Sequence, residues 1–82
     1  MPAQRCVYII RSQSDPSHYY TGVTNDLAQR LEAHDAGRSA HTNRFRPWLL
    51  VAAIEFADED KALAFEKYLK SASGPRQARH SA

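Results

Sequence analysis

The sequence predicts a small α+β domain. Two short runs rich in β-branched and aromatic residues come first, at 6–11 and 19–23, and an Asp-Pro turn signal lies between them. A helical segment, an almost wholly apolar run and a second helical segment follow. With 82 residues, the chain has room for one domain with one modest core. We expect this domain to occupy residues 1–82, with its core at about 6–74.

Composition indicates a globular protein of a reducing compartment. Hydrophobic residues make up 43% of the chain and charged residues 24%, which is enough apolar surface to form a core. Cys6 is the single cysteine, so the chain has no internal disulfide and no cysteine pair at zinc spacing. The longest apolar run, at 48–54, is too short to cross a bilayer. We therefore expect a cytoplasmic protein that does not contact a membrane.

The first two runs are expected to pair as a β-hairpin with a longer loop, and the hairpin leads directly into a helix. Thr24 and Asn25 are both good N-cap residues, and Gly37 is a natural C-terminal stop. The sequence therefore predicts a helix from about Asp26 to Ala36.

This helix has an apolar stripe and a basic pair beside it. Leu27 and Leu31 form the stripe, and Arg30 and His34 follow each other at i, i+4 spacing. Residues at this spacing share one helix face. We therefore expect the guanidinium and the imidazole to point to the same side.

Two tyrosines lie in the predicted hairpin. Alternation along a strand puts Tyr20 and Gly22 on one face. If the hairpin register places Tyr8 beside Tyr20, two phenol groups stand together on the sheet. Gly22 lacks a side chain and leaves room there for a substrate or a neighbouring helix. Without further residues, two strand tyrosines with wet hydroxyls would be the simpler interpretation.

The run Trp48–Phe56 is nearly all apolar. This pattern predicts a third strand that is covered on both faces, or at least buried. Before it lies a polar connection, 37–47, rich in arginine, serine and threonine.

The second helix is predicted at Asp58–Ser71, with acids at its start and lysines toward its end. Ala62, Phe65 and Leu69 form its buried stripe, and Glu66 falls on the edge of that stripe. A carboxylate at such a position costs desolvation unless something pairs with it. Lys70, at i+4, is the simplest partner.

Net charge is only +2, but its distribution is uneven. Between Arg30 and Arg46 the basic residues clearly outnumber the acids, which predicts one positive region on the surface. The loop residues in this region are candidates for contact with a nucleic-acid backbone. A merely solvated loop is an equally good interpretation. The candidates are Arg38, His41, Arg44 and Arg46.

The chemistry of these residues suits a phosphodiester. Its hydrolysis needs a cation to neutralise charge on the phosphate oxygens, a positioned water and a base. Arg30 is a candidate clamp because a guanidinium matches two phosphate oxygens at once. Glu66 is a candidate metal ligand, since one carboxylate is enough to hold Mg²⁺ when water and substrate oxygens complete its shell.

At this point the residues carry a resemblance. The triplets Cys6-Val7-Tyr8 and Tyr20-Thr21-Gly22, followed by Arg30 and His34, resemble the signature of the GIY-YIG nuclease superfamily, and especially its short stand-alone bacterial members. The similarity runs from about Cys6 to Gly74. Its further positions are His41-Thr42, Arg46-Pro47-Trp48, Phe65-Glu66, Tyr68-Leu69-Lys70 and Ser73-Gly74.

The resemblance implies a three-stranded antiparallel sheet flanked by helices, and a DNA endonuclease with one divalent ion, Mg²⁺ or Mn²⁺. By position, Tyr8 is then the general base or water-orienting group, and Tyr20 positions the water and the phosphate. Arg30 stabilises the phosphate, His34 assists Tyr8 or the leaving side, and Glu66 holds the metal. Because a free phenol has a pKa of about 10 and imidazole one of about 6.5, His34 is a competing base.

The resemblance also leaves an alternative open. Many members carry an asparagine after the metal-binding glutamate, and the tail SASGPRQARHSA has none. Either Arg30 with Arg76 or Arg79 takes its place, or catalysis is weak or lost. The alternative function is a non-catalytic nucleic-acid-binding or adaptor module. For the nuclease, the small surface favours selection by DNA structure over sequence, and a protein partner that supplies targeting.

Overall fold

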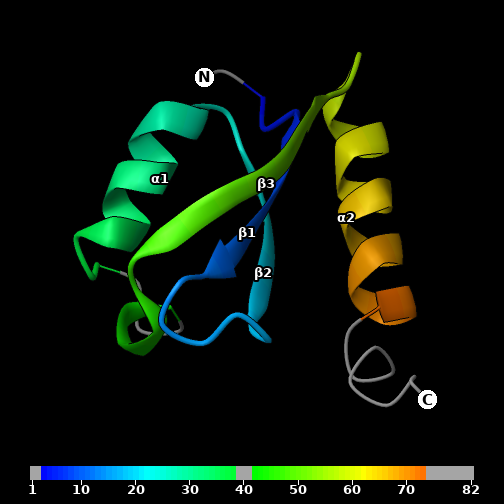
Figure 1. The fold of residues 1–82 in the computed structure, drawn as a ribbon. Helices are drawn as coiled ribbons and strands as arrows, with labels where there is room; N and C mark the ends of the chain where they lie inside the picture. The colour runs from blue at the N-terminus through cyan, green and yellow to red at the C-terminus, as the bar shows by residue number, and fades with distance from the viewer. Residues whose placement is uncertain (1–2, 39–41, 74–82) are drawn as a thin grey trace.

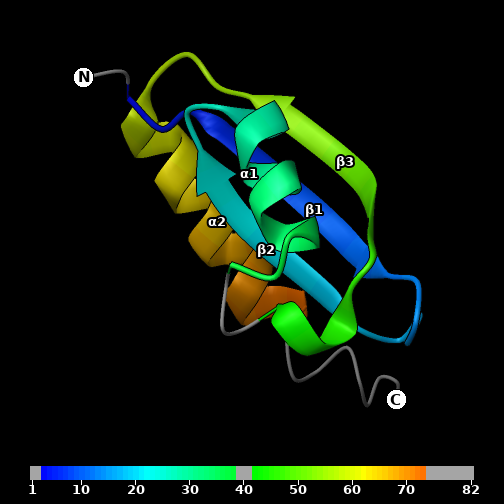
Figure 2. The ribbon, with the colours of Figure 1, turned by 90° about the vertical axis from the view of Figure 1, so that its left-hand side faces the viewer.

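The fold is a three-stranded sheet held between two helices. We describe it from a computed structural model in which residues 3–38 and 42–73 are described. The elements are β1 (Cys6–Ser12), β2 (Tyr19–Thr24), α1 (Leu27–Asp35), the 3₁₀ helix η1 (Asn43–Phe45), β3 (Trp48–Glu55) and α2 (Glu59–Ser73). The two helices lie on opposite sides of the sheet (Figure 1), with α1 in front of the strands and α2 behind them in the turned view (Figure 2). The predicted α+β class is confirmed.

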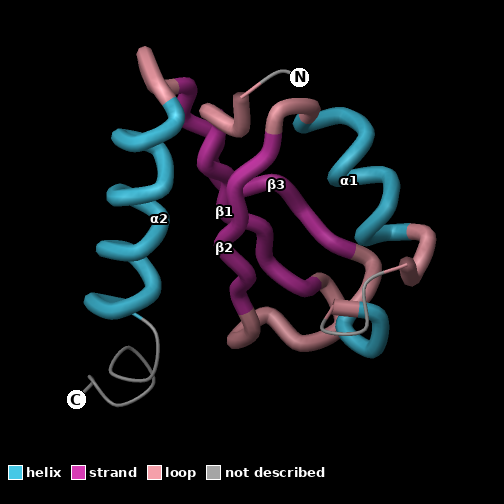
Figure 3. The backbone as a smooth tube through the Cα atoms, turned by 180° about the vertical axis from the view of Figure 1, so that it is seen from behind, coloured by secondary structure: helices cyan, strands magenta, loops and turns pink. Residues whose placement is uncertain are grey.

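The sheet is antiparallel, with β1 in its centre. Its order is β2-β1-β3, so β2 and β3 are both edge strands; Figure 3 shows the sheet from behind, again between the helices. Tyr8 pairs with Gly22 and Ile10 pairs with Tyr20. Pairing with β3 shifts between Ile9 and Ile10, which leaves Val51 as the extra residue of a bulge.

The start of α1 differs slightly from the prediction. The N-cap is Asp26, whose Oδ1 accepts a hydrogen bond from the backbone N–H of Gln29 at 3.1 Å. Thr24 instead supports the cap, because its Oγ1 accepts from the backbone N–H of Asp26 at 3.0 Å. The expectation that Thr24 or Asn25 caps the helix is therefore wrong. Gly37 follows the helix with a φ of 80°, which only glycine adopts without strain.

The main core lies between the sheet and α1. Tyr8, Ile10 and Trp48 are buried there. The predicted stripe of α1, Leu27 and Leu31, packs against them. Tyr20 and Phe45 pack against this cluster as well. On the strand alternation, the buried Val7 faces the opposite side, toward α2.

The third strand is not covered as predicted. Of the large apolar residues in β3, Trp48 is buried, whereas the next three and Ile54 are 40–53% exposed. The prediction of a strand covered on both faces is therefore wrong. The physical reason is position: β3 is an edge strand, and α2 packs on β2 and β1 instead. An apolar run therefore does not ensure burial when the strand has a neighbour on one side only.

Smaller differences concern the ends of elements. The polar connection contains η1, which was not predicted. The second helix begins at Glu59 and ends at Ser73. It begins one residue later than predicted because Asp58 is its N-cap, which accepts a hydrogen bond from the backbone N–H of Lys61 at 2.9 Å. In its predicted stripe, Ala62 is buried while Phe65 and Leu69 are partly buried. Within 3–38 and 42–73, no helix is long and apolar enough to cross a membrane.

Candidate active site

Tyr8 lies in the middle of β1, and its side chain is fully buried. Its ring occupies the space over Gly22: a Cβ placed on that glycine would lie 2.5 Å from the hydroxyl oxygen and 2.6 Å from Cζ of Tyr8. The sequence led us to expect that a substrate or a helix fills this space. The structure corrects that expectation, because the ring of Tyr8 fills it. Gly22 is therefore needed to let the phenol lie flat across β2.

The two tyrosines of the signature meet, although not as direct neighbours. Tyr8 is opposite Gly22, two residues from Tyr20 along β2. The two side chains still share a face of the sheet, and their ring centroids are 6.3 Å apart. Both rings also contact His34, at 5.8 and 5.1 Å between centroids. The phenols and the imidazole therefore form one cluster.

His34 is buried and hydrogen-bonded at both ring nitrogens. Nε2 lies 2.8 Å from the hydroxyl of Tyr8, and Nδ1 lies 2.7 Å from Oγ1 of Thr42. Thr42 is itself buried, and its carbonyl accepts a hydrogen bond from the indole of Trp48 at 3.1 Å. Both contacts together fix the ring and let it hold or pass a proton.

The sequence did not single out Thr42 as a site residue. It lies in an irregular loop eight residues after His34, so no helical or strand periodicity relates the two. The only signal was its place in the His41-Thr42 pair of the resemblance.

Burial sets the protonation of this pair. Desolvation raises the pKa of Tyr8 to about 12, and Tyr20 adds to the rise, while the guanidinium of Arg30 opposes it by hydrogen bonding and charge. Desolvation also lowers the pKa of His34, and the charge of Arg30 lowers it further. At neutral pH the phenol is therefore protonated and the imidazole is neutral. Of the two competing bases, His34 is the group that can accept a proton.

Glu66 reaches the same cluster from α2. Its carboxylate is 17% exposed and forms an ion pair with Lys70 at 2.6 Å, the i+4 partner that the sequence suggested. Lys70 Nζ also lies 5.8 Å from the centre of the Tyr20 ring, and the charge of Glu66 raises the pKa of Tyr8. Tyr8 on β1, Tyr20 on β2 and His34 on α1 are therefore in direct contact. Arg30 on α1 and Glu66 on α2 act on Tyr8 by their charges.

The carboxylate is suited to a metal that needs few protein ligands. Within the described residues, no three histidine, cysteine or acidic side chains cluster. Mg²⁺ keeps several waters and takes one or two carboxylates. Glu66 is partly exposed, and its partner Lys70 is 51% exposed. The residues therefore fit one divalent ion on one carboxylate, and they do not fit a site enclosed by protein ligands.

The predicted basic loop is open to solvent where the structure describes it. Arg38, Arg44 and Arg46 are all exposed, and His41 lies outside the described residues. Arg46 donates to the carbonyl of Asp35 at 3.5 Å. The tail residues Arg76 and Arg79 are likewise not described.

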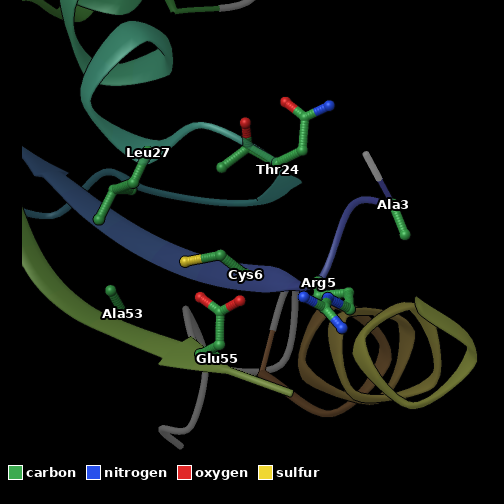
Figure 4. Close-up of a pocket in the computed structure, with 8 residues that line it drawn as sticks. Ala3, Arg5, Cys6, Thr24, Leu27, Ala53 and Glu55 are labelled. Atoms are coloured by element: carbon green, nitrogen blue, oxygen red, sulfur yellow. The ribbon is translucent and has the colours of Figure 1, made fainter. Parts of the chain in front are cut away.

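A separate pocket of about 350 Å³ lies where β1 begins and β2 and β3 end (Figure 4). Cys6, Leu27 and Glu55 are among the residues that line it. Burial, with Glu55 adding, raises the pKa of the Cys6 thiol, so the thiol stays protonated and is a poor nucleophile. None of the five predicted catalytic residues lines this pocket.

Comparisons with known proteins agree with this arrangement. Residues 4–79 match the model of the GIY-YIG catalytic domain. The chain is 40% identical to the structure-specific endonuclease subunit slx1 of Talaromyces stipitatus, over 80% of this chain and 18% of that protein. It is 37% identical to subunit SLX1 of Scheffersomyces stipitis, over 80% of this chain and 22% of the relative.

A bacterial relative is similar as well. The chain is 37% identical to a UPF0213 protein of Streptococcus pneumoniae, over 72% of this chain and 61% of that protein. The chain thus spans only about a fifth of the length of the SLX1 relatives. No solved structure matches it. Because the family match covers both signature strands, both helices and all five predicted catalytic residues, the chain belongs to the GIY-YIG family.

Proposed function

We propose that the protein is an endonuclease that hydrolyses DNA phosphodiester bonds with one divalent ion, Mg²⁺ or Mn²⁺, and selects DNA by structure rather than sequence. The buried hydrogen bond between Tyr8 and His34, with Arg30 beside it, carries this proposal. Two titratable groups with pKa values moved apart next to a cation are typical of a catalytic site. The SLX1 relatives are named structure-specific endonuclease subunits, which supports the same activity.

The proton moves along the tyrosine and the histidine. As water attacks phosphorus, its proton passes to the oxygen of Tyr8 while the phenol's own proton passes to Nε2 of His34. This transfer requires that Nδ1 carries a hydrogen and donates it to Thr42. The P–O bond to the leaving oxygen breaks, and that oxygen takes a proton from solvent. The phenol therefore never has to exist as a free anion, which its pKa of about 12 makes unfavourable.

Other residues bind and orient the phosphate. Arg30 holds two non-bridging oxygens with its fork of donors. Tyr20 is partly exposed, and we assign its hydroxyl to orienting the attacking water. Glu66 would hold the divalent ion once Lys70 has given up its ion pair. When bound, the ion neutralises charge that develops on the phosphate oxygens.

An assay of DNA cleavage tests this function. Supercoiled, single-stranded, flap and branched DNA are incubated with the protein and Mg²⁺ or Mn²⁺. We expect Arg30→Ala and Glu66→Ala each to lose roughly 100-fold or more of the activity, the range for removal of one transition-state contact. Asp60→Ala is the control, because Asp60 is an exposed acid on the same helix. Unchanged cleavage by both variants would indicate a contaminating nuclease and overturn the proposal.

The second candidate is a non-catalytic nucleic-acid-binding or adaptor module. Two observations favour it: Tyr8 is fully buried in the free chain, and Glu66 is already paired with Lys70. For catalysis, DNA or metal must displace a covering side chain. Binding of DNA at moderate salt with no cleavage of any of the four substrates would support the module.

For either candidate we propose a cytoplasmic protein that acts in DNA repair and whose partners are DNA and a targeting protein. The relatives are named subunits, which supports a protein partner. Co-purification of a second protein with the full-length chain from its native cells would support the protein partner, and recovery of the chain alone would contradict it.

A further inference from the structure

An exposed stack of two rings joins the β1–β2 loop to η1. The rings of His18 and Phe45 lie 4.0 Å apart between centroids, with their planes only 20° from parallel. The guanidinium of Arg44 lies 5.7 Å from the centre of the Phe45 ring. The side chain of His18 is 47% exposed, so the stack is open to solvent on the imidazole side. Neither ring takes part in the chemistry described above.

The two ring-bearing residues are held by the same buried serine. The backbone N–H of Ser12 donates to the carbonyl of His18 at 2.9 Å, and its hydroxyl donates to the carbonyl of Phe45 at 2.6 Å. The side chain of Ser12 is fully buried. A stacking surface whose backbone is fixed in this way loses little conformational entropy when a ligand binds.

A carboxylate fixes the outer ring. Nδ1 of His18 lies 2.9 Å from Oδ2 of Asp15. The hydroxyl of Ser17 donates to Oδ1 of Asp15 at 2.8 Å and is the main cause that lowers the pKa of that carboxyl, to which His18 also contributes. The carboxylate is therefore ionised at neutral pH and orients the imidazole with its plane against Phe45.

The stack lies near the catalytic cluster. Phe45 contacts Trp48 at 6.5 Å between centroids, and Trp48 contacts His34 at 6.5 Å. These consecutive ring contacts link His18 to His34, so the stack and the catalytic cluster are neighbours in the fold. The exposed Arg44 and Arg46 lie in the same loop region, where they are available to the backbone of that strand.

We propose that the stack of His18 on Phe45, with Arg44 beside it, binds an unpaired base of the DNA strand close to the phosphate that is cut. The inference rests on the proposed function and names the substrate feature that this function selects. A base inside a duplex already stacks on its neighbours, whereas an unpaired base can place its face on an exposed ring. Flaps and branched junctions supply such a base, and continuous duplex does not.

Binding of fluorescent DNA in EDTA, where divalent ions are absent, tests the stack apart from catalysis. One probe is a duplex with a short single-stranded flap that carries 2-aminopurine, and the second is a continuous duplex of the same sequence. We expect His18→Ala to weaken flap binding roughly 5- to 150-fold, the range for loss of one base–aromatic stack. Its effect on the continuous duplex should be small, and 2-aminopurine quenching by the native protein should disappear.

Three variants distinguish a stacking effect from a charge effect and from the loss of any exposed aromatic side chain. His18→Tyr keeps a ring and should bind the flap like the native protein, whereas His18→Lys keeps a cation without a ring and should bind like His18→Ala. Tyr19→Ala is the matched control, because Tyr19 is 51% exposed and alternation puts it on the opposite face of β2. It should leave the flap affinity unchanged. Thermal melting of each variant checks that the fold is intact.

The outcomes distinguish this inference from the function on which it rests. Flap DNA with an abasic nucleotide at the quenched position should lose the same affinity, and His18→Ala should then add no further loss. Equal weakening of flap and duplex binding, or full rescue by His18→Lys, would overturn the stacking site and leave the nuclease intact. Failure of the native protein to bind any of these DNAs would overturn the stacking site and the proposed function together.

Discussion

The two strands that flank β1 have opposite surroundings. Around Tyr20 of β2, polar groups are buried: Tyr8 and His34 are each at most 2% exposed, and so is Thr42, which bonds to His34. Along β3, apolar side chains face solvent, with Leu50 and Val51 exposed by about half. Hydropathy alone would have reversed these two environments.

Hydrogen bonding and position in the sheet explain the difference. The polar groups tolerate burial because each finds a partner: the phenol and the threonine hydroxyl each bond to a ring nitrogen of His34. The apolar strand stays open because it is at an edge that neither helix covers fully. On the β2 side, the polar groups are buried because they bond to one another. On the β3 side, the apolar side chains are exposed because the strand is at the edge of the sheet.

The largest expected effect is at Gly22. In Gly22→Ala, the new methyl group would overlap the buried ring of Tyr8, so we expect a loss of about 3 kcal/mol in the free energy of unfolding. Urea denaturation measures this loss. The control is Ala53→Ser, since Ala53 is the partner of Tyr8 on β3 and is exposed; we expect a change below about 0.5 kcal/mol. An equally stable Gly22→Ala would show that the phenol does not lie over the glycine.

A substitution at Thr42 tests the buried polar cluster, and its expected effect on stability is smaller than that of Gly22→Ala. Valine has nearly the same shape, but Thr42→Val leaves Nδ1 of the buried His34 without its partner. We expect about 1–2 kcal/mol less stability and a change in the ¹⁵N shifts of the imidazole, because the hydrogen bond that sets its tautomer is gone. Thr42→Ser should restore both. If valine changed stability but left the imidazole shifts as they are, the threonine would act by packing alone.

The pH dependence of stability tests the neutral state of His34. Burial and Arg30 lower its pKa in the fold, while the unfolded chain has the ordinary value of about 6.5. The unfolded state therefore binds the proton more readily, and the free energy of unfolding should fall as the pH drops below about 6.5. Denaturation at a series of pH values measures this fall. His34→Gln should flatten it.

Local rules predicted the elements, and the resemblance to the GIY-YIG superfamily predicted the residues of the cluster. Strand propensity, helix stops and i, i+4 spacing are local, and they gave the hairpin, α1 and the shared side of Arg30 and His34. What failed depends on the neighbours of each strand. The exposure of β3 follows from sheet order, and the contact of Thr42 with His34 follows from the path of a loop. Neither leaves a periodic signal.

The smallest expected effect on stability is on β3. The same substitution, valine to threonine, made once on β1 and once on β3 measures it. Val→Thr keeps the shape of the side chain but replaces one methyl group with a hydroxyl, which costs about 1–3 kcal/mol in a buried site. Val7→Thr should show that cost, because Val7 is 1% exposed in the central strand. Val51→Thr should change the free energy of unfolding by less than about 0.5 kcal/mol, because Val51 is 53% exposed. Urea denaturation of both variants at one protein concentration makes the comparison. An equal cost at both valines would mean that another molecule covers β3 in solution, and the contrast between the two sides of β1 would then hold for the isolated chain alone.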